Sequence, residues 1–169
     1  MSFKLSARSR ARLLGVHPDL VRVVERAITV TIFDFCVVEG VRTLAKQAEY
    51  FRKGKSMTMN SRHLTGHAVD LAPWVNGTIE WNNDAAWEGI ADAMKSASGD
   101  LGITVEWGGD WARFVDKPHF QLSRGTHPDH QRSRNRRAAT CLPGWPSRAP
   151  IMRPDPAASA FGWWRVDNT

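Results

Sequence analysis

The sequence predicts an α+β fold in which flanking helices cover a small antiparallel sheet. Three observations carry this prediction. Segments with helical spacing and segments with strand spacing alternate irregularly through residues 1–122. Turn residues such as Asn76-Gly77 offer the short hairpin links that antiparallel strands use. From residue 123 onward this patterning stops, so we expect a domain over residues 1–122 and a mostly disordered tail over 123–169.

The first elements follow from hydrophobic spacing. Residues 6–15 mix serine, arginine and leucine, and no regular element is assigned to them. A helix is predicted from Pro18, which a first helical turn tolerates, because apolar side chains then recur on one face: Leu20, Val23, Val24, Ala27 and Ile28. Residues 33–38 alternate and are rich in β-branched and aromatic side chains, which predicts a strand.

The middle of the chain predicts one helix and one strand. Thr43 is expected to cap a helix over residues 44–52. Residues 68–72 form an apolar run around a single aspartate and predict a strand that ends at Pro73. A polar, turn-rich stretch follows over residues 74–83.

The last predicted elements complete the sheet. Asp84 is expected to cap a helix that continues to about Ser96, since apolar residues recur there at helical spacing. Residues 103–107 and residues 118–122 predict the third and fourth strands.

The distribution of charge argues against a nucleic-acid-binding domain, although the net charge is +6. Residues 1–122 carry 15 Lys and Arg against 14 Asp and Glu, whereas residues 123–169 carry 8 against 3. The basic character therefore belongs to the tail, which holds an arginine-rich run over 132–137. We expect no nucleic-acid partner and a monomeric protein. Binding of nucleic acid through the tail stays open as an alternative.

Three further features of the sequence indicate where in the cell the protein is expected. The two cysteines, Cys36 and Cys141, lie far apart in unlike contexts, so neither a structural disulfide nor a cysteine metal site is expected. No apolar run is long enough to span a bilayer. The amino-terminal residues lack the pattern of a secretory signal, so we expect a protein that is made and kept in the cytoplasm unless another factor releases it.

Two segments that lie far apart in the sequence contain the candidate metal ligands. His63 and Asp70 flank Gly66, which lets the chain bend, and Asp70 lies in a predicted strand that fixes the direction of its side chain. His119 follows Pro118 at the start of another predicted strand. Two imidazoles and a carboxylate are ligands of a catalytic zinc that leaves one position open for water.

The remaining histidines receive other interpretations. His67 is interpreted as a supporting or wall residue, because Asp70 already fixes the inward direction of its strand. His17, beside Pro18, is interpreted as a helix-start residue. His127 and His130 fall in the tail and are not assigned to a metal.

Together these segments resemble the M15 family of zinc peptidases, which includes D-alanyl-D-alanine carboxypeptidases and L-alanyl-D-glutamate endopeptidases. The resemblance runs from about Ser9 to Leu122 and rests on two motifs, Ser61-x-His63-x-x-Gly66-x-Ala68-x-Asp70 and Asp116-x-x-His119. It implies a hedgehog/DD-peptidase-like fold and a zinc ion held by His63, Asp70 and His119.

The resemblance also implies the general base. Carboxypeptidases of the family carry glutamate three residues before the last histidine, whereas this chain has Asp116, as the endopeptidases of phage endolysins and bacterial autolysins do. Asp116 would take a proton from the attacking water and pass it to the leaving amine. A solvated loop acid is the alternative interpretation of Asp116.

Further residues are expected to contact substrate. Arg42 follows the first predicted strand, where the family has an arginine associated with substrate binding and transition-state charge; a surface ion pair with Glu39 is the alternative. Gln47 and Ser61 are expected to form hydrogen bonds to substrate. Glu106 is a rival base whose spacing does not match the family, so it is expected to face substrate or support a ligand. Trp107 is expected to line the site or to pack in the core.

The sequence thus predicts a zinc-dependent peptidoglycan hydrolase of the endolysin type. It would cleave stem peptides, most simply at the L-alanyl-D-glutamate bond, and this choice of bond is implied by the resemblance alone. A D-alanyl-D-alanine carboxypeptidase and a non-catalytic zinc-fold module that binds the cell wall remain alternatives.

Overall fold

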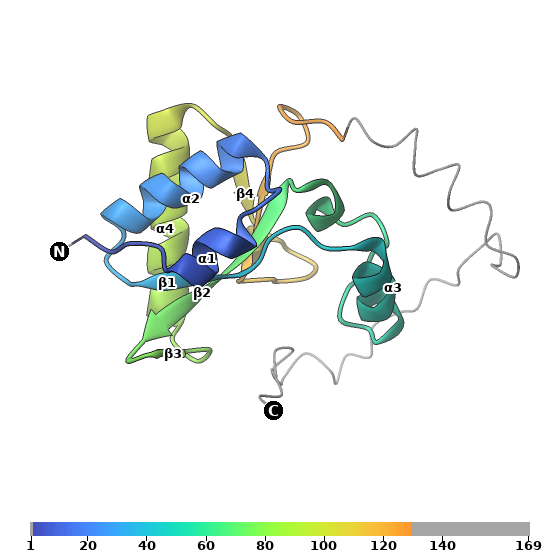
Figure 1. Ribbon diagram of the computed structural model, residues 1–169, viewed down its shortest axis with the longest axis horizontal. Coiled ribbons are helices and arrows are strands. Elements are labelled where there is room, and N and C mark those ends of the chain that lie inside the picture. The colour runs from blue at the N-terminus through green and yellow to red at the C-terminus, as the bar shows by residue number, and fades with distance from the viewer. Residues whose placement is uncertain (1, 130–169) are drawn as a thin grey trace, which may run out of the picture. The chain divides into compact units, whose positions relative to one another are not determined.

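The computed structural model describes residues 2–129 of the chain (Figure 1). These residues form one compact unit that ends at Asp129. The predictions for residues beyond Asp129, including the arginine-rich run and Cys141, lie outside the described residues.

The described unit is an α+β domain built around an antiparallel sheet. The strands are β1 (Phe35–Glu39), β2 (Ala68–Val75), β3 (Thr78–Ile79), β4 (Val105–Trp107) and β5 (His119–Leu122). The α-helices are α1 (Ala7–Arg12), α2 (Pro18–Val30), α3 (Leu44–Arg52) and α4 (Asp84–Leu101), with single 3-10 turns at Arg62–Thr65 and Gly108–Asp110. The strand order is β1-β2-β5-β4, and β3 pairs with β2. The predicted fold class is confirmed.

The core lies between one face of the sheet and two helices. Val69 and Leu71 of β2 and Phe120 and Leu122 of β5 are buried with the apolar stripe of α2 and with α4. Figure 1 shows α2 and α4 together on this side of the sheet, with α3 apart from them. Because side chains alternate along a strand, Asp70 and His119 belong to the opposite face.

Two elements differ from the prediction. The helix α1 was not predicted; it is only six residues long, begins at a Ser6 cap and is held against β1 by Arg12, whose Nη1 donates to the Val37 carbonyl at 2.7 Å. The strand β2 continues through Pro73, since Pro73 pairs with Phe35 and needs no amide hydrogen there, while its carbonyl accepts a hydrogen bond from Glu80.

The helix α4 also differs at both ends. Its cap is Asn83, whose side chain accepts a hydrogen bond from the Ala86 amide, rather than Asp84. It continues beyond Ser96 to Leu101, where Gly102 in the left-handed conformation ends it. The longer helix and its turn shorten the strand predicted over residues 103–107 to Val105–Trp107.

Residues 123–129 contact the domain. Arg62 donates to the His127 carbonyl at 2.9 Å and to the Asp129 carboxylate at 2.6 Å, and the Ser123 amide donates to the Thr104 carbonyl. These contacts place residues 123–129 in the same compact unit as the strands and helices.

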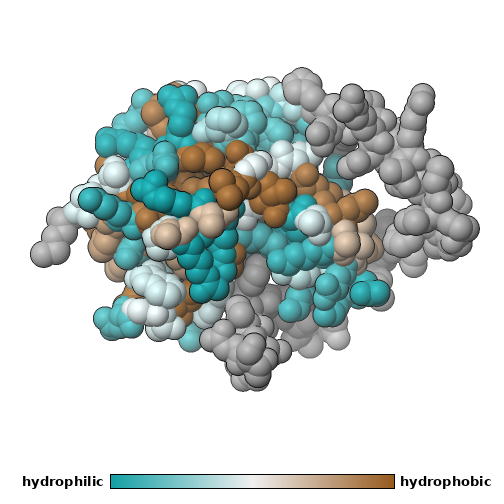
Figure 2. Space-filling model, viewed as in Figure 1, coloured by the Kyte–Doolittle hydropathy of each residue, from teal (hydrophilic) through white to brown (hydrophobic). Residues whose placement is uncertain are grey.

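The surface carries apolar area beyond the core. Figure 2 shows hydrophobic side chains in a band across the face it presents, with hydrophilic side chains on both sides. The exposed large hydrophobic residues include Val41 and Leu44, which flank the buried Arg42 in the chain. Among residues 2–129, no helix combines the length and apolar character needed to cross a bilayer.

Candidate metal centre and active site

A tight turn places His63. The Ser61 hydroxyl accepts a hydrogen bond from the His63 amide, and Gly66 ends the turn at a φ of 72°. A β-carbon at Gly66 would also collide with the Gly15 carbonyl, so this position requires glycine for two reasons. The side chain of Arg62 is fully buried and donates to the Leu122 carbonyl at 2.7 Å, which fixes the turn beside β5.

Strand pairing places the other two candidate ligands. Asp70 of β2 lies directly opposite His119 of β5, on the face away from the core. On the other side of β2, Asp70 lies opposite Glu39 of β1, because a bulge between Val37 and Glu39 shifts the register there. Without that bulge Glu39 would share the face of Val37 and point into the core. The bulge therefore directs Glu39 toward the site.

The three predicted ligands meet at one point. His63 Nε2 lies 3.2 Å from Asp70 Oδ1 and 3.2 Å from His119 Nδ1, and His119 Nδ1 lies 3.3 Å from Asp70 Oδ1. A tetrahedral zinc ion with ligand bonds of about 2.0–2.1 Å separates its ligand atoms by about 3.3–3.4 Å. All three side chains are buried. The triangle of donor atoms thus has the dimensions of one face of a tetrahedral metal site.

Hydrogen bonds outside the triangle fix which ring nitrogen carries the proton. His63 Nδ1 lies 2.7 Å from the Gly40 carbonyl, which can only accept, so Nδ1 is protonated and the Nε2 lone pair faces the triangle. Glu106 accepts from the Gln121 amide nitrogen at 2.8 Å, which turns the Gln121 oxygen toward His119 Nε2 at 3.2 Å. His119 therefore donates from Nε2 and keeps the Nδ1 lone pair.

The electrostatics favour an ionised Asp70 between the two histidines. Burial alone would raise the pKa of Asp70, but the charge of His63 and the hydrogen bonds of both histidines hold that pKa far below its usual range. Burial likewise opposes a charge on His119, yet its hydrogen bond with Asp70 and the charges of Asp70 and Asp116 raise its pKa above the usual value. The pKa of His119 is therefore raised beside an ionised Asp70, at the place where a metal cation would bind.

Asp116 lies at the edge of this cluster. Its amide donates to the Gly108 carbonyl, and its carbonyl accepts from the His119 amide at 3.1 Å. A β-carbon at Gly108 would collide with Asp116, so the glycine allows this close approach. Within the described residues no hydrogen bond reaches the Asp116 carboxylate. Burial, followed by the charge of Asp70, raises the pKa of Asp116 to about 6.

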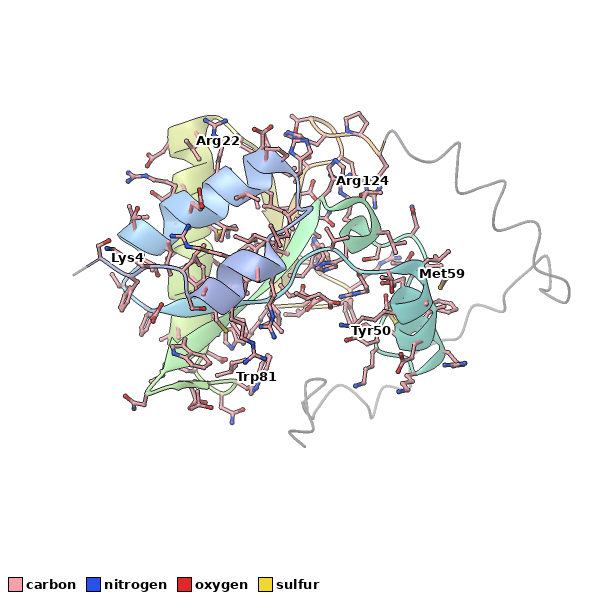
Figure 3. The ribbon with its side chains drawn as sticks, viewed as in Figure 1. Lys4, Arg22, Tyr50, Met59, Trp81 and Arg124 are labelled. Carbon is pink, nitrogen blue, oxygen red and sulfur yellow. The ribbon has the colours of Figure 1, made fainter. Side chains whose placement is uncertain are left out.

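Arg42 is buried beside Asp70 and held by several groups. Its guanidinium donates to Glu39 at 2.5 Å and to Gln47 at 2.8 Å, and lies 3.5 Å from the outer oxygen of Asp70. The ring of Tyr50 packs against it at 4.8 Å, on the side of α3 that faces the strands (Figure 3). Arg42 Nε is buried and has no partner among residues 2–129, so the guanidinium keeps one unused donor.

The other predicted substrate contacts have varied surroundings. Gln47 is fully buried, and its amide contacts Arg42, Ser56 and the Thr58 carbonyl. Ser61 caps the turn that carries His63, and the Glu106 carboxylate is joined to Gln121. Direct contact of these side chains with substrate stays a prediction.

The tryptophans near the site form a partly buried wall. Trp107 stacks on the core residue Phe120, its ring centroid 6.2 Å away, and its indole nitrogen donates to the Lys117 carbonyl at 2.7 Å. Trp111 lies closer to the site, with its ring 5.2 Å from that of His119.

Sequence reasoning missed the residues that orient the ligands. Gln121 stands two residues after His119, on the same face of β5, and this spacing was an available signal. The roles of Glu39 and Gly40 depend on the bulge and on a carbonyl, which side-chain motifs do not reveal. The structure also brings His17, Asp19 and His127 together, a grouping that their positions in the sequence do not suggest.

Known proteins match this chain over nearly all of the described unit. Residues 1–128 match the family model described as phage L-alanyl-D-glutamate peptidase. The L-alanyl-D-glutamate peptidase of Escherichia phage T5 is 38% identical over 130 residues, which cover 75% of this chain and 94% of that protein. The peptidoglycan L-alanyl-D-glutamate endopeptidase CwlK of Bacillus subtilis is 31% identical over 101 residues, 53% of this chain and 60% of the relative.

A solved structure supports the same assignment. The crystal structure of the L-Ala D-Glu endopeptidase ChiX of Serratia marcescens matches with a TM-score of 0.72 and 44% sequence identity. The match covers 76% of this chain and 96% of that one. The family recognised from the two motifs is thereby confirmed, and the chain belongs to the phage L-alanyl-D-glutamate peptidases.

Proposed function

We propose that this chain is a zinc-dependent peptidoglycan hydrolase that cleaves the L-alanyl-D-glutamate bond of stem peptides. The observation that carries the proposal is the triangle of His63 Nε2, Asp70 Oδ1 and His119 Nδ1, whose sides of 3.2–3.3 Å fit zinc. The choice of bond is supported by the names of the relatives in phage T5, Bacillus subtilis and Serratia marcescens.

The donor set favours zinc over harder cations. Two neutral imidazoles with one carboxylate suit zinc, whereas magnesium and calcium prefer oxygen ligands. When bound at these three residues, zinc would polarise the scissile carbonyl and lower the pKa of a coordinated water. The carbonyl of Gly40 and the side chain of Gln121 hold the two rings in the orientation this requires.

Asp116 is the proposed general base. Its carboxylate is partly exposed, electrostatically linked to Asp70 and both histidines, and without a hydrogen bond among the described residues. It can therefore accept a proton from the attacking water and deliver it to the amine of the leaving glutamate. A pKa of about 6 before a metal binds makes Asp116 a better base than an ordinary aspartate. Glu106, the rival, already accepts from Gln121.

Arg42 is proposed to hold Asp70 and to meet the substrate. Its contact with the outer Asp70 oxygen leaves the inner oxygen directed at the two histidines. The permanent charge of Arg42 beside Asp70 would also stabilise negative charge that develops on the substrate. Gln47 would then act through Arg42, since its amide oxygen accepts from the guanidinium.

The proposed setting follows from this chemistry. The enzyme would act as a monomer on the cell wall, with its catalytic unit ending near Asp129, where the contacts of residues 123–129 with the domain end. A chain truncated after Asp129 should retain peptidase activity, whereas one truncated after Leu122 loses the partners of the buried Arg62.

The decisive experiment combines peptidoglycan digestion with metal analysis. Wild type and Asp116→Asn are incubated with purified peptidoglycan, and zinc content is measured in both. Asp110→Asn is the matched control, because Asp110 is an exposed acid on the neighbouring turn that pairs with Lys95. We expect all three proteins to hold about one tightly bound zinc ion, and only Asp116→Asn to lose activity, by about 10²–10⁴-fold.

The products distinguish the alternatives. Cleavage between L-alanine and D-glutamate creates a new glutamate amino terminus and releases no free alanine, whereas a carboxypeptidase releases D-alanine. Wild type that binds zinc and cleaves nothing would favour the wall-binding module. Wild type without zinc would contradict the metal assignment.

A further inference from the structure

A second group of metal-ligating side chains lies outside the active site. His17 and Asp19 stand at the start of α2, and His127 belongs to the segment after β5. One ligand atom from each of these residues lies within 4.8 Å of the others. Figure 3 labels Arg22 on α2 and Arg124 on the segment after β5, the two parts of the chain from which the cluster comes. The mechanism proposed above uses none of these residues.

The distances centre on one carboxylate oxygen. Asp19 Oδ2 lies 3.1 Å from His127 Nε2 and 3.9 Å from His17 Nδ1. The first separation is close to the ligand spacing of a tetrahedral site, about 3.3–3.4 Å, and the second exceeds it by a fraction of an ångström. The side chains of His17 and Asp19 are about one third exposed, so small rotations can close this gap.

The lone pairs are available for a metal. His17 Nδ1 accepts a hydrogen bond from the Asp19 amide at 3.2 Å, so this nitrogen is unprotonated and its one lone pair would bind a metal in exchange for that hydrogen bond. His127 Nδ1 lies 2.9 Å from the Thr126 hydroxyl, which can accept the Nδ1 proton and leave the Nε2 lone pair toward Asp19. The Asp19 amide stands at a helix start, where water can replace the partner it would lose.

The charges around the cluster are compatible with a cation. Arg22 donates to the other oxygen of Asp19 at 3.4 Å and leaves Oδ2 to the histidines. The ring of His67 lies 5.0 Å from that of His17, and burial, together with the charges of Arg62 and His17, lowers the pKa of His67. A neutral His67 adds no positive charge beside the cluster.

We propose that His17, Asp19 and His127 form a second binding site for a divalent transition metal ion, of which Zn²⁺ is the natural probe. This second site has the same donor types as the active site, two imidazoles and a carboxylate. Its side chains are partly exposed to solvent and more loosely arranged. The ion would join the start of α2 to the segment that follows β5, the strand that carries His119. Occupancy should therefore restrain residues 123–129 without contributing to catalysis.

The test is a calorimetric titration of the chelator-treated full-length chain with Zn²⁺. Wild type should bind one equivalent of Zn²⁺ tightly and a second equivalent more weakly. His17→Asn keeps a side-chain acceptor for the Asp19 amide, and His127→Gln keeps the size of the side chain; each should weaken only the second equivalent, by about tenfold or more. Asp100→Asn, an exposed acid paired with Arg26, is the control and should keep both equivalents.

The variants separate this site from the active site. His63→Ala should lose the tight equivalent and retain the weaker one, so failure of the catalytic zinc assignment would be recognised independently. Circular dichroism of each variant without metal verifies folding. The proposed second site would be contradicted if wild type bound only one equivalent of Zn²⁺. It would also be contradicted if both His17→Asn and His127→Gln still bound the second equivalent as wild type does.

Discussion

The chain holds two groups of two histidines and one aspartate, and their surroundings differ in almost every respect. In the first group, His63, Asp70 and His119 are buried, and their donor atoms lie 3.2–3.3 Å apart. In the second, His17, Asp19 and His127 are partly exposed, and Asp19 Oδ2 lies 3.1 Å from His127 Nε2 and 3.9 Å from His17 Nδ1. Identical donor types therefore occur once in a rigid frame and once in an adaptable one.

The difference comes from what holds each residue. Asp70 and His119 lie on paired central strands, and each ring of the first group has a fixed acceptor on its far side, the Gly40 carbonyl or Gln121. The second group stands on a helix start and a connecting segment, where its two ring Nδ1 atoms contact the Thr126 hydroxyl and the Asp19 backbone amide. Preorganisation thus distinguishes a proposed catalytic centre from a proposed accessory one.

Each group has one arginine that contacts its aspartate. Removal of these two arginines should give the largest difference in the free energy of unfolding between the groups. Arg42→Met leaves the buried Glu39 without its closest partner and removes one contact of the buried Asp70, so we expect a loss of about 3 kcal/mol in the free energy of unfolding. Lys46, which contacts Glu39 at 2.9 Å, keeps the loss at the low end for a broken buried pair. Urea unfolding with chelator present measures it.

Arg22→Met is the matched control for Arg42→Met. Arg22 pairs with Asp19 at 3.4 Å but is largely exposed, so its removal should cost about 0.5 kcal/mol or less. Equal losses in the two variants would contradict the contrast between a rigid and an adaptable group.

Two aspartates, Asp116 beside the first group and Asp19 within the second, should change stability with pH in opposite directions. The native pKa of Asp116, about 6, exceeds that of an unfolded aspartate, about 3.9, so its ionisation opposes folding as pH rises through this interval. In the metal-free protein, Asp116→Asn should therefore raise the free energy of unfolding by about 2 kcal/mol at pH 8. Below pH ~4 it should leave the free energy of unfolding unchanged. Urea unfolding at both values measures the difference.

Asp19→Asn provides the comparison for Asp116→Asn. The hydrogen bond with His127 lowers the pKa of Asp19, so its ionised form stabilises the native state above the unfolded pKa, and this stability is lost as pH falls. Asp19→Asn should accordingly destabilise the protein slightly at pH 8. A stability gain in both variants at pH 8 would contradict the assignment of opposite signs.

The link from Glu106 through Gln121 to His119 predicts a smaller effect on metal affinity. Glu106→Leu removes the acceptor that fixes the Gln121 amide, so the amide can turn and present its NH₂ group to His119. His119 would then carry its proton on Nδ1, the proposed ligand atom. We expect the tight zinc affinity to fall by about tenfold, or 1.4 kcal/mol, in a competition titration with a chromogenic chelator.

Glu106→Gln is the rescue for this series. A glutamine oxygen at position 106 can still accept from Gln121, so zinc affinity should return close to that of wild type. Unchanged affinity in Glu106→Leu would show that the Gln121 orientation does not depend on Glu106.

The sequence allowed the proposed catalytic ligands to be predicted but not their supports. His63 and Asp70 lie seven residues apart around a glycine turn and a strand, so local geometry almost brings them together. Asp116 and His119 were matched through a second motif. The contacts of Glu39 and Gln121 depend on a bulge and on strand register, which one sequence does not specify.

The errors in the fold have similar causes. The helix α1 is short, and its Ser6 cap was overlooked because no long apolar stripe follows it. The grouping of His127 with Asp19 spans 108 positions in the chain and depends on where β5 ends, so neither residue carries a local signal for it. Long-range contacts of this kind require the topology first.

The smallest expected change in stability distinguishes two roles of His17, capping of α2 and binding of a metal in the second group. His17 caps α2, so His17→Ala should lower stability by about 1 kcal/mol without zinc, whereas His17→Asn keeps a capping oxygen and should remain close to wild type. With excess zinc only wild type gains a further increase in melting temperature from the second site, since both variants lack the imidazole. A zinc-dependent gain in His17→Asn as large as in wild type would mean that His17 only caps the helix through Nδ1 and does not bind the metal.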